Sequence, residues 1–353
     1  MNLGEIFTPN AIAINWTETG SNRIPYLGEG LFPAKKKMGL NLSWIKGYKG
    51  LPVSLMPSNF DAKPTIRDRI GVTKIDSEMA FFREAMVIKE KDEQEIMNVQ
   101  DSNSPYAAEV LSRIFDDTNT LIEGALVVPE RMRMQLLSSQ GSPQITITAN
   151  NLTYSYNYDP NNEFSANNYL ALTGANKWSD CTNSNPMEDI RTAQDKIEEK
   201  TGVRPSIAIM SRKTFNYLLK NEKVKSGILA QNITANIFMT DGILKAFFKE
   251  QLGISIVIYN KKFKTETGTT SNFYPDDMCA LIPDGFLGST WFGTTPEERS
   301  GMQSGMQVSI VNTGISIAVT RPNTIPLKTE TVASEIVLPS FECMDECFVM
   351  KVN

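Results

Sequence analysis

The chain contains no histidine in its 353 residues. Histidine is the side chain whose ordinary pKa lies nearest neutral pH, and it supplies the base in Ser/His/Asp and Cys/His nucleophile pairs. Those catalytic pairs, and zinc sites that contain histidine, are therefore excluded. We expect a protein that is not an enzyme and that carries no cofactor and no metal ion.

Cysteine is scarce as well. The four cysteines are Cys181, Cys279, Cys343 and Cys347, and they lack the paired spacing of a structural zinc site. Cys343 and Cys347 form one close pair, but neither a second pair nor a histidine is there to complete a tetrahedron. We expect free thiols and a reducing compartment.

Long apolar runs and clusters of positive charge are also missing. No segment approaches the roughly 18 apolar residues of a membrane span, and Met1–Glu5 does not form the basic start of a signal peptide. The formal net charge is -5, and Lys35–Lys37 is the only run of three basic residues. A weak nucleic-acid contact there is one alternative, but a solvated charged segment is favoured. We expect the chain to stay in the cytoplasm where it is made.

Two further kinds of site have little support. No phosphate-binding glycine motif is present, and the glycines between Gly285 and Gly293 follow a strand without opening a helix, so we interpret them as turn glycines. Adjacent carboxylates do not face one site, so we interpret them as solvated charge. The pairs are Asp116-Asp117, Asp276-Asp277 and Glu297-Glu298. Asp276-Asp277 would bind calcium only with oxygen ligands from elsewhere in the fold.

What is present is the composition of a folded protein, 41% hydrophobic and 21% charged, with a length that suggests two lobes. Residues 1–50 have too many prolines and glycines for a long helix or a regular sheet, yet they carry large apolar side chains. This arm should pack on its own core or on a neighbour. Strand-forming segments at 51–56 and 74–82, with a polar turn between them, predict a two-stranded ribbon that is marginal alone.

A long helix follows the ribbon. Ser104 is a suitable N-cap, Pro105 suits the first position, and apolar residues from Ala107 to Val128 recur at helical spacing. Pro129 should kink or divide this helix, and Gly141 suits its end. Alternating residues over 144–148 and 152–158 then predict a hairpin, and 160–185 predicts a loop.

The next segment has the pattern of an α/β lobe. Helices are predicted over 187–200, after a cap at Ser211, and over 242–252; strands are predicted over 205–210, 254–259 and 278–283. The tail predicts strands over 315–320, 334–338 and 347–352. We expect these to rejoin the first hairpin beside the long helix, which makes one lobe discontinuous in sequence.

This order of parts resembles a known shell fold, the Johnson or Hong Kong ninety-seven-type fold of tailed-phage major capsid proteins. Within that group the chain is similar to the lambda-like major capsid protein E family. The similarity rests on Pro205–Ser211 with Phe215 and Leu218, Gly253–Tyr259, Asn272–Asp277 and Ser334–Pro339, in that order.

The resemblance implies an α+β fold divided into an N-terminal arm (1–49), an extended E-loop ribbon (50–98), a spine helix with P-domain strands (99–174), an axial A-domain (175–310) and P-domain return strands (311–353). It implies candidate contacts between subunits in the arm and the ribbon. These are Trp16, Phe32, Trp44, Phe60, Arg67 and Arg69.

The implied function is a major capsid protein that self-assembles as hexamers and pentamers into an icosahedral shell around double-stranded DNA. The partners that follow are further copies of the chain, a scaffold protein, a portal at one vertex, a decoration protein and weakly contacted DNA. Because Met1 lies close to the arm, the scaffold is expected to be a separate protein. The expected location is the virion capsid, assembled in the bacterial host cytoplasm. An encapsulin-like nanocompartment that encloses enzymes is the alternative, and an ordinary α/β enzyme or binding domain is a more distant one.

Overall fold

The computed structural model describes residues 8–19, 25–46, 73–88, 90, 94, 106–149, 152–231, 239–304, 307–320 and 329–353. The chain forms two compact units, each built from three separate segments. Unit 1 comprises Met1–Leu42, Asp76–Met132 and Ser289–Ser340; unit 2 comprises Ser43–Ile75, Arg133–Gly288 and Phe341–Asn353. The sequence predicts discontinuity for one lobe, and both units are in fact discontinuous.

Unit 1 is built on a sheet whose long central strand is β16 (Thr329–Phe341). The order is β1 (Ala34–Lys36), β13 (Gly288–Phe292), β16, β15 (Ile315–Thr320) and β14 (Val308–Val311), with β4 (Ala80–Ile88) also on β16. β1 pairs with β13 in parallel, whereas β4, β15 and β14 pair antiparallel with their neighbours. The strands β15 and β16 confirm two of the predicted tail strands, while β13 and β14 are additions.

Helices pack on this sheet. They are α2 (Pro9–Thr19), α5 (Tyr106–Leu137) and α11 (Pro296–Ser304). The short helix α3 (Leu27–Leu31) hydrogen-bonds to α5 instead. The core joins Ile12 and Trp16 of α2, Ile122 of α5, and Ile315 and Ile317 of β15. Burial of this apolar face supplies the free energy that orders an otherwise irregular arm.

The long helix is confirmed, and of the two effects expected at Pro129, a kink or a division, the division does not occur. α5 runs from Tyr106 to Leu137 with Pro129 inside it. A proline removes one helical hydrogen bond, and buried Leu126 and Met132 on either side of it offset that loss by packing. The predicted cap at Ser104 and Pro105 lies outside the described residues.

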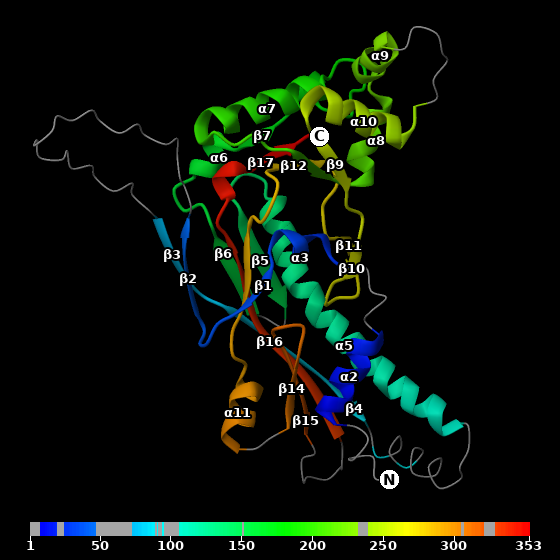
Figure 1. Ribbon diagram of the computed structural model, residues 1–353, viewed down its shortest axis with the longest axis vertical. Coiled ribbons are helices and arrows are strands. Elements are labelled where there is room, and N and C mark those ends of the chain that lie inside the picture. Colours follow the sequence, from blue (N-terminus) through cyan, green and yellow to red (C-terminus); the bar gives the residue numbers. More distant parts are fainter. Residues whose placement is uncertain are drawn as a thin grey trace, which may run out of the picture. The chain divides into compact units, whose positions relative to one another are not determined.

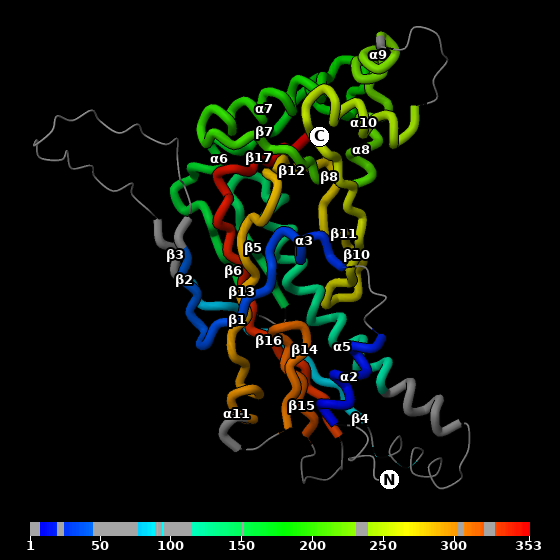
Figure 2. The backbone as a smooth tube through the Cα atoms, in the orientation of Figure 1, coloured from blue at the N-terminus to red at the C-terminus, as the bar shows by residue number. Residues whose placement is uncertain are grey.

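Unit 2 contains the α/β lobe. Its sheet has the order β7 (Tyr169–Ala171), β17 (Phe348–Lys351), β12 (Met278–Ile282), β8 (Ile207–Met210) and β9 (Ser255–Ile258). Figure 2 shows the red C-terminal strand β17 beside β7 and β12, which come from distant parts of the sequence. The prediction that the tail strands rejoin the first hairpin is therefore wrong: β17 pairs with β7 and β12, and β15 and β16 belong to the sheet of unit 1. β7 lies within the segment predicted as a loop.

One side of this sheet is covered by helices. They are α7 (Pro186–Thr201), α8 (Arg212–Lys220), α9 (Glu222–Gln231) and α10 (Asp241–Leu252). α7 ends at Gly202, whose φ of 74° is a conformation that glycine adopts without strain. The Ser211 hydroxyl accepts the N–H of Thr214 and caps α8, as predicted. Short helical turns α6 (Glu163–Asn167), η2 (Gly174–Asn176) and η3 (Met344–Glu346) complete the unit.

The described residues also form three two-stranded ribbons, visible in Figure 1. They are β2 (Asn41–Lys46) with β3 (Thr73–Glu78), β5 (Gln144–Ala149) with β6 (Leu152–Asn157), and β10 (Lys262–Lys264) with β11 (Thr270–Asn272). The hairpin β5–β6 confirms its prediction.

The first ribbon differs from its prediction. The segment 74–82 is not one strand, because it breaks at Met79 and sends β4 to the sheet of unit 1. The described partner of β3 is β2, which precedes the predicted start of the ribbon. The predicted strand 51–56 lies outside the described residues.

Candidate assembly surfaces

Three predicted contact residues of the arm lie inside their own unit. Trp16 is 6% exposed and belongs to the core of unit 1, and Phe32 is fully buried. Trp44 in unit 2 is 7% exposed and packs against Tyr158, with ring centroids 5.3 Å apart. Side chains buried this deeply have little area left for a neighbouring subunit. Phe60, Arg67 and Arg69 lie outside the described residues, and a role between subunits stays a prediction for all six.

Hydrogen bonds as well as packing fix the arm within unit 1. The backbone N–H of Gly28 donates to the buried carboxylate of Glu130 at 3.1 Å. The Thr290 hydroxyl donates to the carbonyl of Phe32 at 2.9 Å, where β1 begins its parallel pairing with β13. These bonds tie the residues before β1 to α5 and β13, which are distant in sequence.

The first turn of α11 carries two carboxylates that the sequence interpretation treats as solvated, and this interpretation is wrong. Glu297 and Glu298 are only 8% and 7% exposed. Glu297 contacts the Arg83 guanidinium of β4 at 2.5 Å and accepts the Ser334 hydroxyl of β16 at 2.5 Å. The two partners of Glu297 lie on two different strands, β4 and β16.

Glu298 contacts a different strand, the edge strand β1. It accepts a hydrogen bond from Lys36 of β1 at 2.7 Å. Lys35 places its ammonium 5.3 Å from the centroid of the Trp291 ring. The interpretation of the lysine run as solvated is therefore wrong for Lys36, which is ion-paired. Lys35 is exposed but also contacts the Trp291 ring. Both lysines lie on β1, at the edge of the sheet.

Asp277 is the centre of a second polar cluster, in unit 2. Lys213 donates to its carboxylate at 2.8 Å, and the Tyr217 hydroxyl donates to it at 2.9 Å. Partial burial acts to raise the pKa of Asp277, but the hydrogen bonds from Lys213 and Tyr217 outweigh it and hold this pKa below its usual value. Asp277 has φ of 64°, so an aspartate in left-handed conformation is held by these partners.

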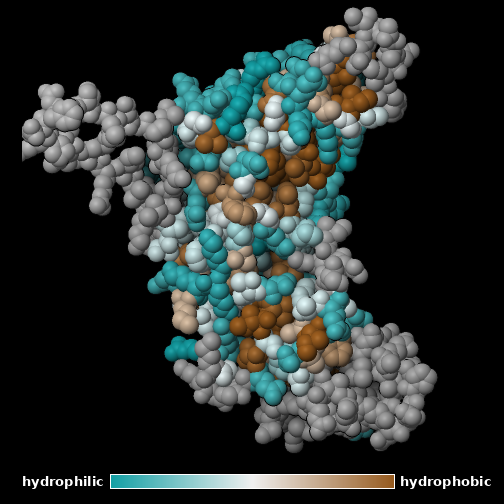
Figure 3. Space-filling view, in the orientation of Figure 1, coloured by the Kyte–Doolittle hydropathy of each residue, from teal (hydrophilic) through white to brown (hydrophobic). Residues whose placement is uncertain are grey.

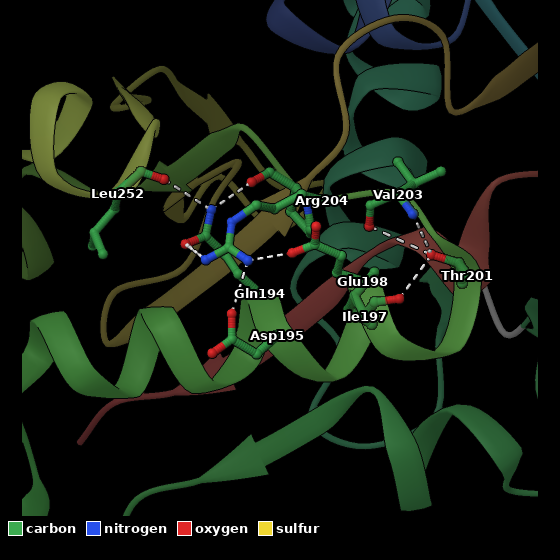
Figure 4. A network of polar contacts seen from close by, with 9 residues as sticks. Gln194, Asp195, Ile197, Glu198, Thr201, Val203, Arg204 and Leu252 are labelled. Carbon is green, nitrogen blue, oxygen red and sulfur yellow. Dashed lines mark hydrogen bonds and ion pairs between the residues drawn. The ribbon is translucent and has the colours of Figure 1, made fainter.

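A third polar cluster fixes the turn between α7 and β8 (Figure 4). Arg204 pairs with both Asp195 and Glu198 of α7. The buried Gln194 amide donates to the carbonyls of Pro205 and Leu252 at 2.7 and 3.2 Å. Burial acts to lower the pKa of Arg204, and the two carboxylates raise it overall. Figure 3 shows the surface over α7 as largely hydrophilic.

Two of the four thiols are buried and two are partly exposed. The four cysteines are free, and Cys279 and Cys347 are fully buried. Burial raises the pKa of both thiols, which disfavours the reactive thiolate. In the part of the chain that the structure describes, no group of three or more Cys, Asp or Glu residues is arranged to hold a metal ion.

The described helices include none that is long and apolar enough to cross a membrane. The helix α5 is long, but its sequence contains charged residues such as Glu123, Glu130 and Arg131.

The hairpin β5–β6 carries no charged side chain. No Asp, Glu, Lys or Arg occurs between Arg133 and Asp159. One face holds buried Ile145 and Ile147 of β5 opposite Tyr156 and Tyr154 of β6, and the other face holds hydroxyl and amide side chains. Leu152 is 53% exposed.

Comparison with known proteins gives a consistent family. A family model for phage major capsid protein E matches residues 17–310. A protein of an E. coli CFT073 prophage assigned as a capsid protein is 12% identical, with a TM-score of 0.61 over 98% of this chain and 99% of that one. A phage-related protein from Bordetella bronchiseptica RB50 is 14% identical, with a TM-score of 0.57 over 96% of both chains. No curated protein matches the sequence.

Proposed function

The chain belongs to the phage major capsid protein E family, and from this premise we propose that it builds the head of a tailed bacteriophage or prophage as hexamers and pentamers. It is a capsid shell protein of the α+β Hong Kong ninety-seven-type fold and a component of the virion capsid. The family match over residues 17–310 is the observation that carries this conclusion.

The finer assignments are part of the proposal. The shell is icosahedral and encloses double-stranded DNA, which a net charge of -5 keeps weakly bound and mobile for packaging. A separate scaffold protein guides assembly in the host cytoplasm, a portal occupies one vertex, and a decoration protein binds outside. The chain has no enzymatic activity of its own.

The five-part division of the chain is also proposed here. The arm (1–49) and the E-loop ribbon (50–98) contact neighbouring subunits, the spine helix region (99–174) and return strands (311–353) form the P-domain, and 175–310 forms the A-domain at the capsomer axis. The buried positions of Trp16, Phe32 and Trp44 support an arm whose described part is anchored in its own subunit, with contacts made by its remaining surface.

Electron microscopy of the overexpressed chain, alone and with a scaffold protein, tests the proposal. We expect capsomers, tubes or shells. A sharp monomer peak in light scattering at high concentration with scaffold present would contradict it. The encapsulin alternative is less favoured, and the content of particles purified from the natural host distinguishes the two: packaged DNA supports a phage head, and a protein cargo supports a nanocompartment.

A further inference from the structure

The two outer edges of the hairpin β5–β6 differ in how their backbone groups are hydrogen-bonded. The outer edge of β5 is closed at Gln144 and Thr146 by side chains from the end of α5 and the turn after it. The Gln135 amide donates to the carbonyl of Thr146 and accepts its N–H, both at 3.0 Å. The Ser139 hydroxyl accepts the N–H of Gln144 at 3.1 Å and also contacts its carbonyl at 3.4 Å. These side chains replace a neighbouring strand.

This closure fixes the direction of the backbone groups on β6. In an antiparallel pair, the backbone N–H and C=O groups of two opposite residues either bond to each other or both point away from the pair. The backbone groups of Gln144 and Thr146 point away from β6, so those of the opposite residues Asn157 and Ser155 point away from β5. By alternation the backbone groups of Thr153 also point away from β5. Among the hydrogen bonds of the described residues, none joins the backbone of these three to another strand.

The open edge of β6 also lacks the usual protection. Natural sheets guard exposed edges with charged residues, proline or a bulge. β6 reads Leu-Thr-Tyr-Ser-Tyr-Asn and has neither a charge nor a proline, and its threonine and tyrosines favour strand pairing. The closed edge of β5 shows that this fold does protect the other side of the same hairpin.

We propose that the outer edge of β6 joins two copies of the chain, by antiparallel pairing of β6 with β6 about a two-fold axis through Ser155. This contact rests on the proposed function as a self-assembling shell protein. A two-fold contact needs a surface that complements itself, and β6 has no charge that would repel its own copy.

The register follows from the backbone directions. With Ser155 opposite Ser155 of the second copy, Thr153 lies opposite Asn157, so all three outward-facing residues are bonded. The same register places Tyr154 opposite Tyr156 of the second copy. Within one chain these rings already stack with centroids 6.4 Å apart, and cross-strand aromatic pairs stabilise sheets. Shifting the register by two residues leaves outward-facing groups unbonded.

A disulfide test reports this register directly. In a hydrogen-bonded antiparallel pair the two Cα atoms lie about 5.5 Å apart, within the range a disulfide spans. We expect Ser155→Cys particles to give a disulfide dimer on mild oxidation, in more than half of the chains. The matched control Thr148→Cys, exposed on the same face but on β5, and the wild-type chain should remain monomeric on a non-reducing gel.

A second pair of variants tests the need for the edge. Ser155→Pro removes an outward N–H without removing a bond to β5, whereas Ser155→Ala keeps that N–H. We expect at least a tenfold loss of particles for the proline variant and none for the alanine variant. Thr148→Pro, on the outer edge of β5, should assemble normally, and circular dichroism checks that each variant is folded.

The outcomes separate this contact from the general function. Wild-type particles with no Ser155→Cys crosslink, or an equal crosslink at Thr148→Cys, overturn the β6 contact alone. A loss of assembly in Ser155→Pro without that crosslink also overturns it, because another partner then occupies the edge. If Ser155→Pro fails to fold, the crosslink decides. A wild-type chain that never assembles overturns the proposed function together with this contact.

Discussion

Trp44 packs its indole ring against the phenol ring of Tyr158, with centroids 5.3 Å apart and planes inclined by 36°. The two residues are far apart in sequence and both lie in unit 2. Tyr158 is almost fully buried, and this burial raises the pKa of its hydroxyl well above the ordinary value. The contact anchors β2 to the end of the hairpin β5–β6.

Truncation of this anchor should be costly. Trp44→Ala removes a large buried ring, and we expect unit 2 to lose about 3–5 kcal/mol of unfolding free energy. Urea denaturation followed by circular dichroism measures the loss. Met38→Ala is the control, because Met38 is 84% exposed, and it should change stability by less than about 0.5 kcal/mol. Equal stability of Trp44→Ala and wild type would show that Trp44 does not stabilise unit 2 and would favour its predicted role between subunits.

Removal of the carboxylate of Glu297 should weaken unit 1. Glu297→Ala leaves Arg83 and the buried Ser334 without their shared partner, and hydrogen bonds to charged groups contribute about 1.5–3 kcal/mol. We expect a lower urea midpoint by a corresponding amount. Glu188→Ala breaks an exposed pair with Arg191 and should cost less than about 1 kcal/mol. Similar midpoints for the two variants would show that Glu297 is solvated after all.

Gly293 is a position where any side chain should be rejected. A Cβ there would lie 2.7 Å from Ile336 and 2.9 Å from both the Gly39 carbonyl oxygen and Met79. We expect Gly293→Ala to destabilise unit 1 by about 1–3 kcal/mol through overpacking. Gly30→Ala in α3 has open space around it and should be neutral or stabilising. Thermal unfolding compares the two, and a neutral Gly293→Ala would contradict the close approach.

Asp277 should give the lobe of unit 2 a pH-dependent term. Its pKa is lower in the folded chain than in the unfolded one. Its stabilisation is therefore complete above the unfolded pKa of about 3.9 and is lost as the pH falls through the folded pKa. We expect Asp277→Asn to be less stable than wild type at pH 7, and the difference to shrink below pH of about 4. Asparagine tolerates the left-handed backbone, so the variant isolates the charge. A difference that stays constant down to pH 3 would rule out an ionic origin.

The sequence patterns did not predict every helix, in the arm or later in the chain. Two helices that the pattern missed both begin with Thr-Pro: Thr8-Pro9 opens α2, and Thr295-Pro296 opens α11. In each case the threonine hydroxyl accepts a backbone N–H, from Ala11 and from Glu298. This is an N-cap followed by proline at the first helical position, a local signal that was available in the sequence. The density of prolines and glycines around α2 concealed it.

The sequence by itself determined the family, the long helix, the hairpin β5–β6 and most of the α/β lobe. These elements depend on local periodicity and on caps such as Ser211 and Gly202, which act within a few residues. The order of short motifs along the chain then sufficed to identify a capsid protein.

Only the tertiary structure decided which strands share a sheet and which charges are buried. β17 pairs with β12 rather than with the hairpin, and Glu297 and Glu298 bind Arg83 and Lys36 from distant segments. Strand edges and carboxylates are chemically similar wherever they occur, so their partners are selected by the packing of the whole unit. The same reason explains Trp16 and Trp44: an apolar side chain in an irregular arm fits its own core or a neighbour equally well in sequence, and three-dimensional packing places both in the core.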